Sequence, residues 1–248
     1  MNQYRPTGFR VLPTVVKNLL ILNILFYIAD LAIKAKFNVD LSEYLGLHYV
    51  TSESFYPHQF ITYMFMHDTN GLTHILFNMF ALWMFGSALE NFWGPKNFLI
   101  YYFVTGIGAA VVQMIVNYIQ ISYLESTMAY EQIQTVLNEG YKILQDNKNY
   151  MDPAMGQLNL LLNSSTIGAS GAVFGLLLAF GMMFPNALIY IYFFIPMKAK
   201  YFVMVYGAIE LASGLYNAQS DNVAHFAHLG GMIFGFFLIK AWRKKKIN

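Results

Sequence analysis

Two side chains that together can cleave an acyl bond lie in apolar stretches of the sequence, Ser170 and His228. Ser170 falls in STIGASGAVFGLLLAF, next to glycine and alanine, which is an unusual setting for a lipid-spanning helix. It either packs helices closely, as small residues do, or serves as a nucleophile at a helix N-terminus. Free N–H groups and the positive end of the helix dipole would there stabilise an oxyanion.

The composition decides which elements must position these residues. The 248 residues are 57% hydrophobic and 17% aromatic, and only 11% are charged, against about 25% in a typical soluble domain. We therefore expect an all-α polytopic membrane protein. The absence of cysteine excludes disulfides and thiolate sites, and the net charge of +2 argues against nucleic acid as a partner.

Six membrane spans are predicted from the apolar stretches. They cover residues 15–33, 72–93, 97–119, 168–184, 199–217 and 225–242. The short apolar run 187–195 lies between Pro185 and Pro196 and is expected to be interfacial or a loop. Residues 120–165 form a long outer connection with a loose helical period, so an extramembrane helix or partial disorder is expected there.

The basic residues set the predicted orientation. With six spans both termini lie on one side, and 11 of the 15 Lys and Arg residues fall on that side. Lys34, Lys36, Lys142 and Lys148 fall opposite. The positive-inside rule then places both termini in the cytoplasm. The compact form suggests a multi-pass protein of the bacterial plasma membrane, with an organelle membrane left open.

Ser170 and His228 are predicted to lie at the same depth. The 14 residues from Ser170 to Phe184, and the 14 from His228 to Trp242, each correspond to about 21 Å of helix. In a hydrocarbon core about 30 Å thick, both side chains then lie roughly 9 Å below the outer surface.

Glycines flank both residues at helical spacing. Gly171 and Gly175 follow the serine, and Gly231 and Gly235 follow His228. Each pair presents a smooth face, so the fourth and sixth spans are expected to approach closely enough for a direct Ser–His hydrogen bond. The irregular polar segment LNSST before Gly168 is tolerated at membrane depth only where it is buried or lines a water-filled cavity.

The second span contributes HILFN, in which His74 and Asn78 lie one turn apart on the same face. The 15 residues from Asn78 to Trp93 correspond to about 22 Å, close to the depth of Ser170. Polar groups at that depth are costly unless they face the bundle interior, so both are candidate site residues.

These motifs together resemble the rhomboid family of intramembrane serine proteases. The similarity rests on HILFN and ENFWG in the second span, GASG opening the fourth, IPMKAKY before the fifth and AHLGGMIFG in the sixth. It implies one rhomboid-like domain over residues 1–248 with a six-helix bundle, and the long helical insertion between spans 3 and 4 departs from the family pattern. It also implies a Ser–His dyad without a third acid. We expect no cofactor and no metal.

The resemblance assigns roles residue by residue. Ser170 is the nucleophile and His228 the general base, while His74, Asn78 and the backbone N–H of Ser170 hold the oxyanion. Phe174 would pack against the imidazole and orient it, and Gly168, Gly171, Gly231 and Gly235 permit the packing. Glu90 matches a structural acid. The expected partners are the lipid bilayer and transmembrane protein substrates cleaved near the outer face; the oligomeric state is open.

Other interpretations remain open on the sequence. His225 and His228 share a helix face and are a candidate metal pair. Glu210 is either a hydrogen-bonded interior group or the proton relay of a small transporter, although a transporter should have two halves with matching broken helices. A non-catalytic protein that binds membrane helices is the remaining alternative.

Overall fold

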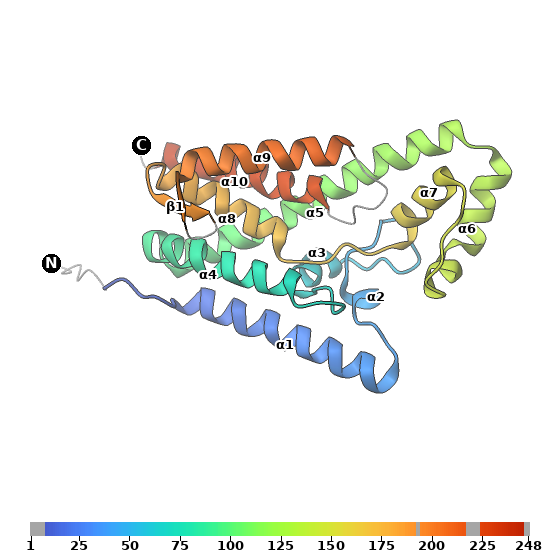
Figure 1. Ribbon diagram of the computed structural model, residues 1–248, viewed down its shortest axis with the longest axis horizontal. Helices are drawn as coiled ribbons and strands as arrows, with labels where there is room; N and C mark the ends of the chain where they lie inside the picture. The colour runs from blue at the N-terminus through green and yellow to red at the C-terminus, as the bar shows by residue number, and fades with distance from the viewer. Residues whose placement is uncertain (1–7, 192–193, 217–223, 246–248) are drawn as a thin grey trace.

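The computed structural model describes residues 8–191, 194–216 and 224–245, and these form a mostly helical structure (Figure 1). Six helices coincide with the six predicted spans. They are α1 (Thr14–Phe37), α4 (Thr73–Trp93), α5 (Pro95–Thr127), α8 (Ser170–Met183), α9 (Ala199–Tyr216) and α10 (His225–Lys245). By length and apolar composition, α1, α4 and α5 are long enough to cross a membrane, and α8 is a shorter apolar helix.

The centre of the bundle is formed by α10, which packs most extensively against α5 and α8. α4 packs against α8 and α5, α1 covers α4, and α9 lies against α8 and α10. The start of α1 and the end of α10 lie at the same end of the bundle (Figure 1). The main hydrophobic core includes Leu82, Phe98, Tyr101 and Leu176, all fully buried.

The loop between α1 and α4, residues 38–72, carries α2 (Ser42–Leu45), α3 (Gln59–Thr62) and the 3₁₀ turn η1 (Tyr63–Phe65). Gln59 is fully buried and ties this loop together, because its amide donates to the carbonyls of Tyr44 and Ser54 and accepts from the His48 N–H. We call residues 38–72 the outer loop, after the side on which the sequence predicts it to lie.

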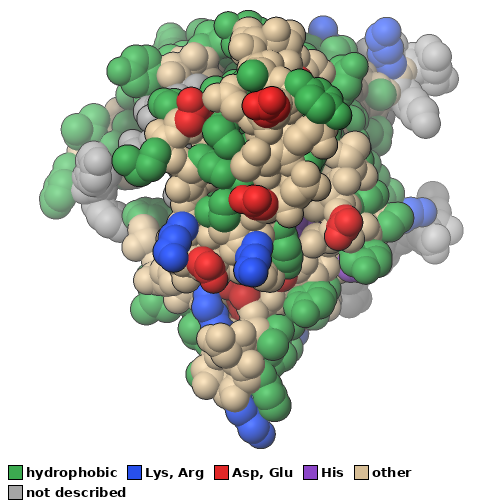
Figure 2. Space-filling model, turned by 90° about the vertical axis from the view of Figure 1, so that its right-hand side faces the viewer, with side chains coloured by type: hydrophobic (Ala, Val, Ile, Leu, Met, Phe, Trp, Pro, Cys, Tyr) green, Lys and Arg blue, Asp and Glu red, His purple; other side chains and the backbone are tan. Residues whose placement is uncertain are grey.

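The insertion between α5 and α8 begins later in the chain than predicted and contains more helical structure. The sequence predicts that the third span ends at residue 119, but α5 continues to Thr127, because Ile121 and Leu124 bury their side chains against the insertion. Two helices follow rather than one, α6 (Tyr130–Gln145) and α7 (Pro153–Asn163), with a small core around Val136 and Leu158. Figure 2 looks onto this end of the molecule, where acidic and basic side chains lie among hydrophobic ones.

The apolar run 187–195, predicted as interfacial or loop, contributes to a β-hairpin. β1 (Leu188–Ile191) pairs antiparallel with β2 (Ile195–Lys198), in a register that places Ile189 opposite Met197. The hairpin connects α8 to α9 at the end of the bundle where α1 begins (Figure 1).

Candidate active site

Ser170 is the first residue of α8, and the backbone before it is held by the outer loop. Leu47 and Thr166 exchange two backbone hydrogen bonds of 2.9 Å, and the Gly168 N–H donates to the Tyr63 carbonyl at 2.9 Å. Because the first N–H groups of a helix have no acceptor within it, the start of α8 offers donors beside the Ser170 hydroxyl.

Gly168 lets the ring of His74 approach the serine. Its φ of +125° lies in the region that side-chain-bearing residues rarely adopt. A Cβ at this position would also lie 3.0 Å from Cε1 and Nε2 of His74 and 3.6 Å from the Ser170 Oγ. Any larger residue would therefore separate the imidazole of His74 from the nucleophile.

His228 lies one turn into α10, with only 7% of its surface exposed, and meets the serine directly. Its Nε2 is 2.8 Å from the Ser170 Oγ, which is hydrogen-bonding distance. The structure thus brings together the two residues that equal depth predicts to pair.

The glycines permit this contact, but not in the predicted pairing. A Cβ at Gly231 would collide with the carbonyl of Gly171, so α8 and α10 do approach closely there. Gly175 and Gly235 instead face α5: a Cβ on Gly175 would meet Thr105, and one on Gly235 would meet the Tyr101 hydroxyl. Two of the four glycines therefore permit close packing against α5, because α5, α8 and α10 all pack against one another.

Phe174 stacks on the His228 ring. The ring centroids are 4.2 Å apart and the planes are within 6° of parallel. One turn after the serine, this side chain covers one face of the imidazole and restricts its rotation, and this is the packing that the family resemblance implies.

The candidate oxyanion donors are placed in different ways. The backbone N–H of Asp68 donates to Nδ1 of His74 at 3.4 Å, so the ring proton lies on Nε2, the nitrogen beside Gly168. Asn78 is buried, and its amide donates to the His74 carbonyl one turn earlier at 2.8 Å. His74 is therefore oriented as a donor toward the site, and Asn78 retains one N–H for a ligand.

Glu210 contacts the other side of the His228 ring. Its Oε2 lies 2.8 Å from Nδ1 of His228 and 2.7 Å from Nδ1 of His225. This agrees with the interior hydrogen-bonded group that is one of the two interpretations of Glu210 from the sequence, whereas the family resemblance implies a dyad without an acid beside the histidine. A single carboxylate in the apolar run VMVYGAIELASGLY was the available signal.

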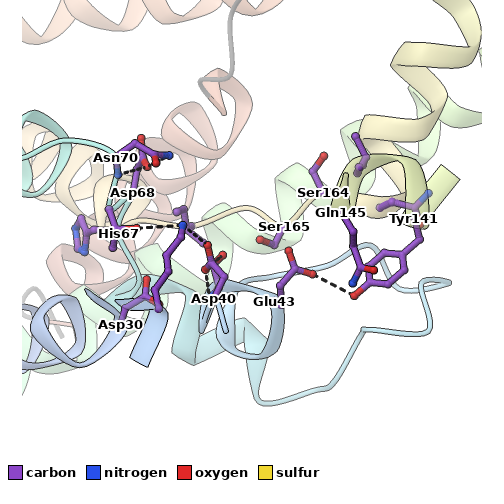
Figure 3. Close-up of a pocket in the computed structure, with 16 residues that line it drawn as sticks. Asp30, Asp40, Glu43, His67, Asp68, Asn70, Tyr141, Gln145, Ser164 and Ser165 are labelled. Carbon is purple, nitrogen blue, oxygen red and sulfur yellow. Dashed lines mark hydrogen bonds and ion pairs between the residues drawn. The ribbon is translucent and has the colours of Figure 1, made fainter. Parts of the chain in front are cut away.

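A polar cavity of about 300 Å³ borders the loop that leads to Ser170. Figure 3 shows Asp40 and Glu43 of the outer loop on one side, Tyr141 of α6 on another, and Ser165 between them. Nearby, burial lowers the pKa of His67 to about 4, with the adjacent His74 as a second cause. His67 is therefore uncharged at neutral pH.

The helical fold, the apolar sequence and the family match given next together indicate a polytopic helical membrane protein. The chain belongs to the rhomboid family, because the Rhomboid domain matches residues 54–245. It is 28% identical over 176 residues to RHOMBOID-like protein 12, mitochondrial, from Arabidopsis thaliana, and 24% identical over 177 residues to Rhomboid protein 1, mitochondrial, from Saccharomyces cerevisiae. Each alignment covers 70% of this chain but only 43% and 40% of the relatives, so the chain spans less than half their length.

Proposed function

We propose that the protein is an intramembrane serine protease that cleaves transmembrane segments of other proteins near one face of the bilayer. The observation that carries the proposal is the 2.8 Å contact between the Ser170 hydroxyl and Nε2 of His228 at the start of α8. Family membership supports it, because rhomboid proteins are typically serine proteases.

The chemistry follows from this contact. Nε2 of His228 takes the hydroxyl proton as Oγ of Ser170 attacks the peptide carbonyl, and a tetrahedral oxyanion forms. The N–H of Ser170, Nε2–H of His74 and the amide of Asn78 would stabilise that charge. The imidazolium then returns the proton to the leaving amine, and water hydrolyses the acyl-enzyme by the same route.

The membrane placement is part of the proposal. All six helices that match the predicted spans cross the bilayer, and α8, at about 21 Å, is too short to fill a core of about 30 Å. Ser170 would then lie below the outer surface, reached by water from the side of the outer loop. The two curated relatives carry the word mitochondrial in their names, and the same arrangement suits an organelle membrane or a bacterial plasma membrane.

The test is replacement of the nucleophile. Ser170→Ala should abolish cleavage of a model transmembrane substrate and labelling by a serine-directed phosphonate, while thermal stability in detergent stays unchanged. Ser164→Ala, an exposed serine of the same loop, is the matched control and should keep full activity. Wild-type turnover by a folded Ser170→Ala variant would contradict the protease proposal and leave helix binding as the function.

Orientation is tested by thiol labelling, since the natural chain has no cysteine. In the plasma membrane of intact bacteria, a cysteine at exposed Asn138 in α6 should react with an impermeant maleimide, and one at exposed Lys198 in β2 should not. The reverse pattern would place the Ser170 end of the bundle in the cytoplasm.

A further inference from the structure

Glu210 is turned inward on a helix whose outer face is apolar. It is the sole acidic residue of α9, and it is 7% exposed. Its neighbours Ile209 and Leu211 are 53% and 48% exposed. A carboxylate is costly to bury unless its oxygens accept hydrogen bonds, so its burial here requires the partners that it has found.

Those partners are both imidazole nitrogens. One oxygen of Glu210, Oε2, lies within 2.8 Å of Nδ1 of His228 and Nδ1 of His225. An ionised carboxylate can only accept hydrogen bonds, so each imidazole must carry its proton on Nδ1. His228 then has an unprotonated Nε2, and this is the nitrogen that contacts the Ser170 hydroxyl.

The carboxylate therefore selects the tautomer that a general base needs. Phe174 restricts rotation of the His228 ring by stacking on its face, but an apolar ring cannot decide which nitrogen holds the proton. His225 provides the carboxylate with a second attachment, so the position of Glu210 does not depend on His228 alone.

Glu210, His225 and His228 each offer one ligand atom within 4.8 Å of the others, so a divalent metal ion is the competing explanation for the cluster. Ligand atoms bound at about 2.0 Å in a tetrahedral zinc site are roughly 3.3 Å apart. The two contacts of Oε2 are 2.7 and 2.8 Å, the range of charge-assisted hydrogen bonds. The geometry thus favours protons over a metal between these groups.

We propose that Glu210 is the positioning acid of this site, so that Ser170, His228 and Glu210 act as a serine–histidine–glutamate triad contributed by α8, α10 and α9. The inference rests on the proposed protease function. Glu210 takes no proton: the serine proton moves to Nε2 and later to the leaving amine. The Nδ1–H to Glu210 bond is kept throughout and stabilises the imidazolium that forms in between.

The test uses the full chain in detergent and compares Glu210→Gln, Glu210→Asp and a control, Glu90→Gln. Glu90 is a second buried carboxylate, on α4, and it contacts neither histidine. Glu210→Gln should lower kcat by at least about 100-fold, because an amide no longer requires the correct tautomer. KM should change little, and Glu210→Asp should recover part of kcat. Glu90→Gln should keep kcat within about threefold.

A spectroscopic measurement covers the case in which Glu210→Gln fails to fold. In protein labelled with ¹⁵N-histidine, Ser170→Ala should retain a downfield Nδ1–H resonance for His228 that is absent in His228→Ala. His225→Gln should retain it too, since the Glu210–His228 bond is independent. A His228 protonated on Nε2 in the resting protein would overturn the proposal.

Three outcomes separate the possible failures. If wild-type protein shows no Ser170-dependent cleavage, the protease function itself is wrong. If wild type cleaves and folded Glu210→Gln has the same kcat, the triad is wrong and the protease stands. If EDTA changes kcat of the wild type and zinc chloride reverses that change, the cluster is a metal site and the positioning role is overturned.

Discussion

Glu90 and Glu210 are two buried carboxylates in apolar helices, and they lie at opposite ends of the bundle. Glu90, near the end of α4, accepts from the backbone N–H groups of Val15 and Val16 at 3.0 and 2.8 Å. These are among the first N–H groups of α1, whose N-cap Pro13 provides no side-chain acceptor. Glu210 accepts instead from Nδ1 of two imidazoles, and a neutral imidazole can carry its proton on either ring nitrogen.

The difference shows how a partner determines what a buried acid does. Backbone N–H groups at a helix start have fixed direction, so Glu90 joins α1 to α4 and contributes stability. Imidazole partners have two tautomers, so Glu210 fixes a protonation pattern as well as a position. We therefore expect substitutions at the Glu210 end to change turnover and substitutions at the Glu90 end to change stability.

The largest effect is expected at the histidines of the Glu210 end. His228→Ala should reduce cleavage and phosphonate labelling below detection, because the serine loses its base. His225→Ala should keep measurable activity, since the Glu210–His228 contact remains. Thermal stability in detergent shows whether each variant is folded. An active, folded His228→Ala beside an inactive, folded His225→Ala would reassign the base.

The next effect concerns the oxyanion donors. Asn78→Ala should lower kcat by up to about 10²–10³-fold with little change in KM if its amide is a major donor. His74, oriented by the Asp68 N–H, can compensate in part. The double variant His74→Ala, Asn78→Ala removes that compensation, and an unchanged turnover rate in it would exclude both residues from the site.

At the other end of the bundle, Glu90→Gln should change the stability of the protein and leave its turnover unchanged. An amide can accept only one of the two backbone hydrogen bonds and places an N–H against the other donor. The unfolding free energy should fall by about 2 kcal/mol. Thermal denaturation in detergent measures this, and kcat of the folded fraction should be retained. A loss of turnover in Glu90→Gln without a loss of stability would contradict the division of roles between the two ends of the bundle.

The smallest effect is a pH dependence that belongs to the outer loop. His67 has a pKa of about 4 in the folded protein, below the value of 6.5 for an exposed histidine. Between these values the unfolded chain binds more protons, so stability is complete above about pH 6.5 and declines as the pH falls toward 4. The loss should be about 1 kcal/mol from pH 7 to 5.5.

His67→Phe removes the titrating group and should make the stability less dependent on pH over the same range. Thermal denaturation at pH 7 and 5.5 provides the comparison with the wild type. An identical pH dependence in both proteins would show that another group is responsible.

Sequence reasoning placed the helices well because each is a continuous apolar stretch, and the six predicted spans all coincide with helices. The end of α5 was missed because Ile121 and Leu124 read as the start of a loop. Their burial depends on α6 and α7, which lie further along the chain. The hairpin was missed for the same reason, since Ile189 pairs with Met197 across a turn.

The site was predictable where depth along a helix was sufficient. Counting residues from helix ends placed Ser170 and His228 at one level, and they are in contact. Rotation about a helix axis is harder to read. The side of α9 that faces α10 decides that Glu210 meets His228, and the surrounding apolar residues give no strong periodicity to indicate it. For the same reason, the sequence does not reveal that Gly175 and Gly235 face α5 instead of each other.

The assignment of Ser170 to α8 and of its base to α10 has a consequence for biosynthesis. The ribosome delivers α8 to the membrane well before α10, and Glu210 on α9 arrives between them. A chain whose synthesis has reached only α9 holds the serine and the acid without the imidazole that links them. The Ser170–His228 contact therefore forms only after α10 has been made and inserted, so the chemistry that we propose is closed to unfinished copies of the chain.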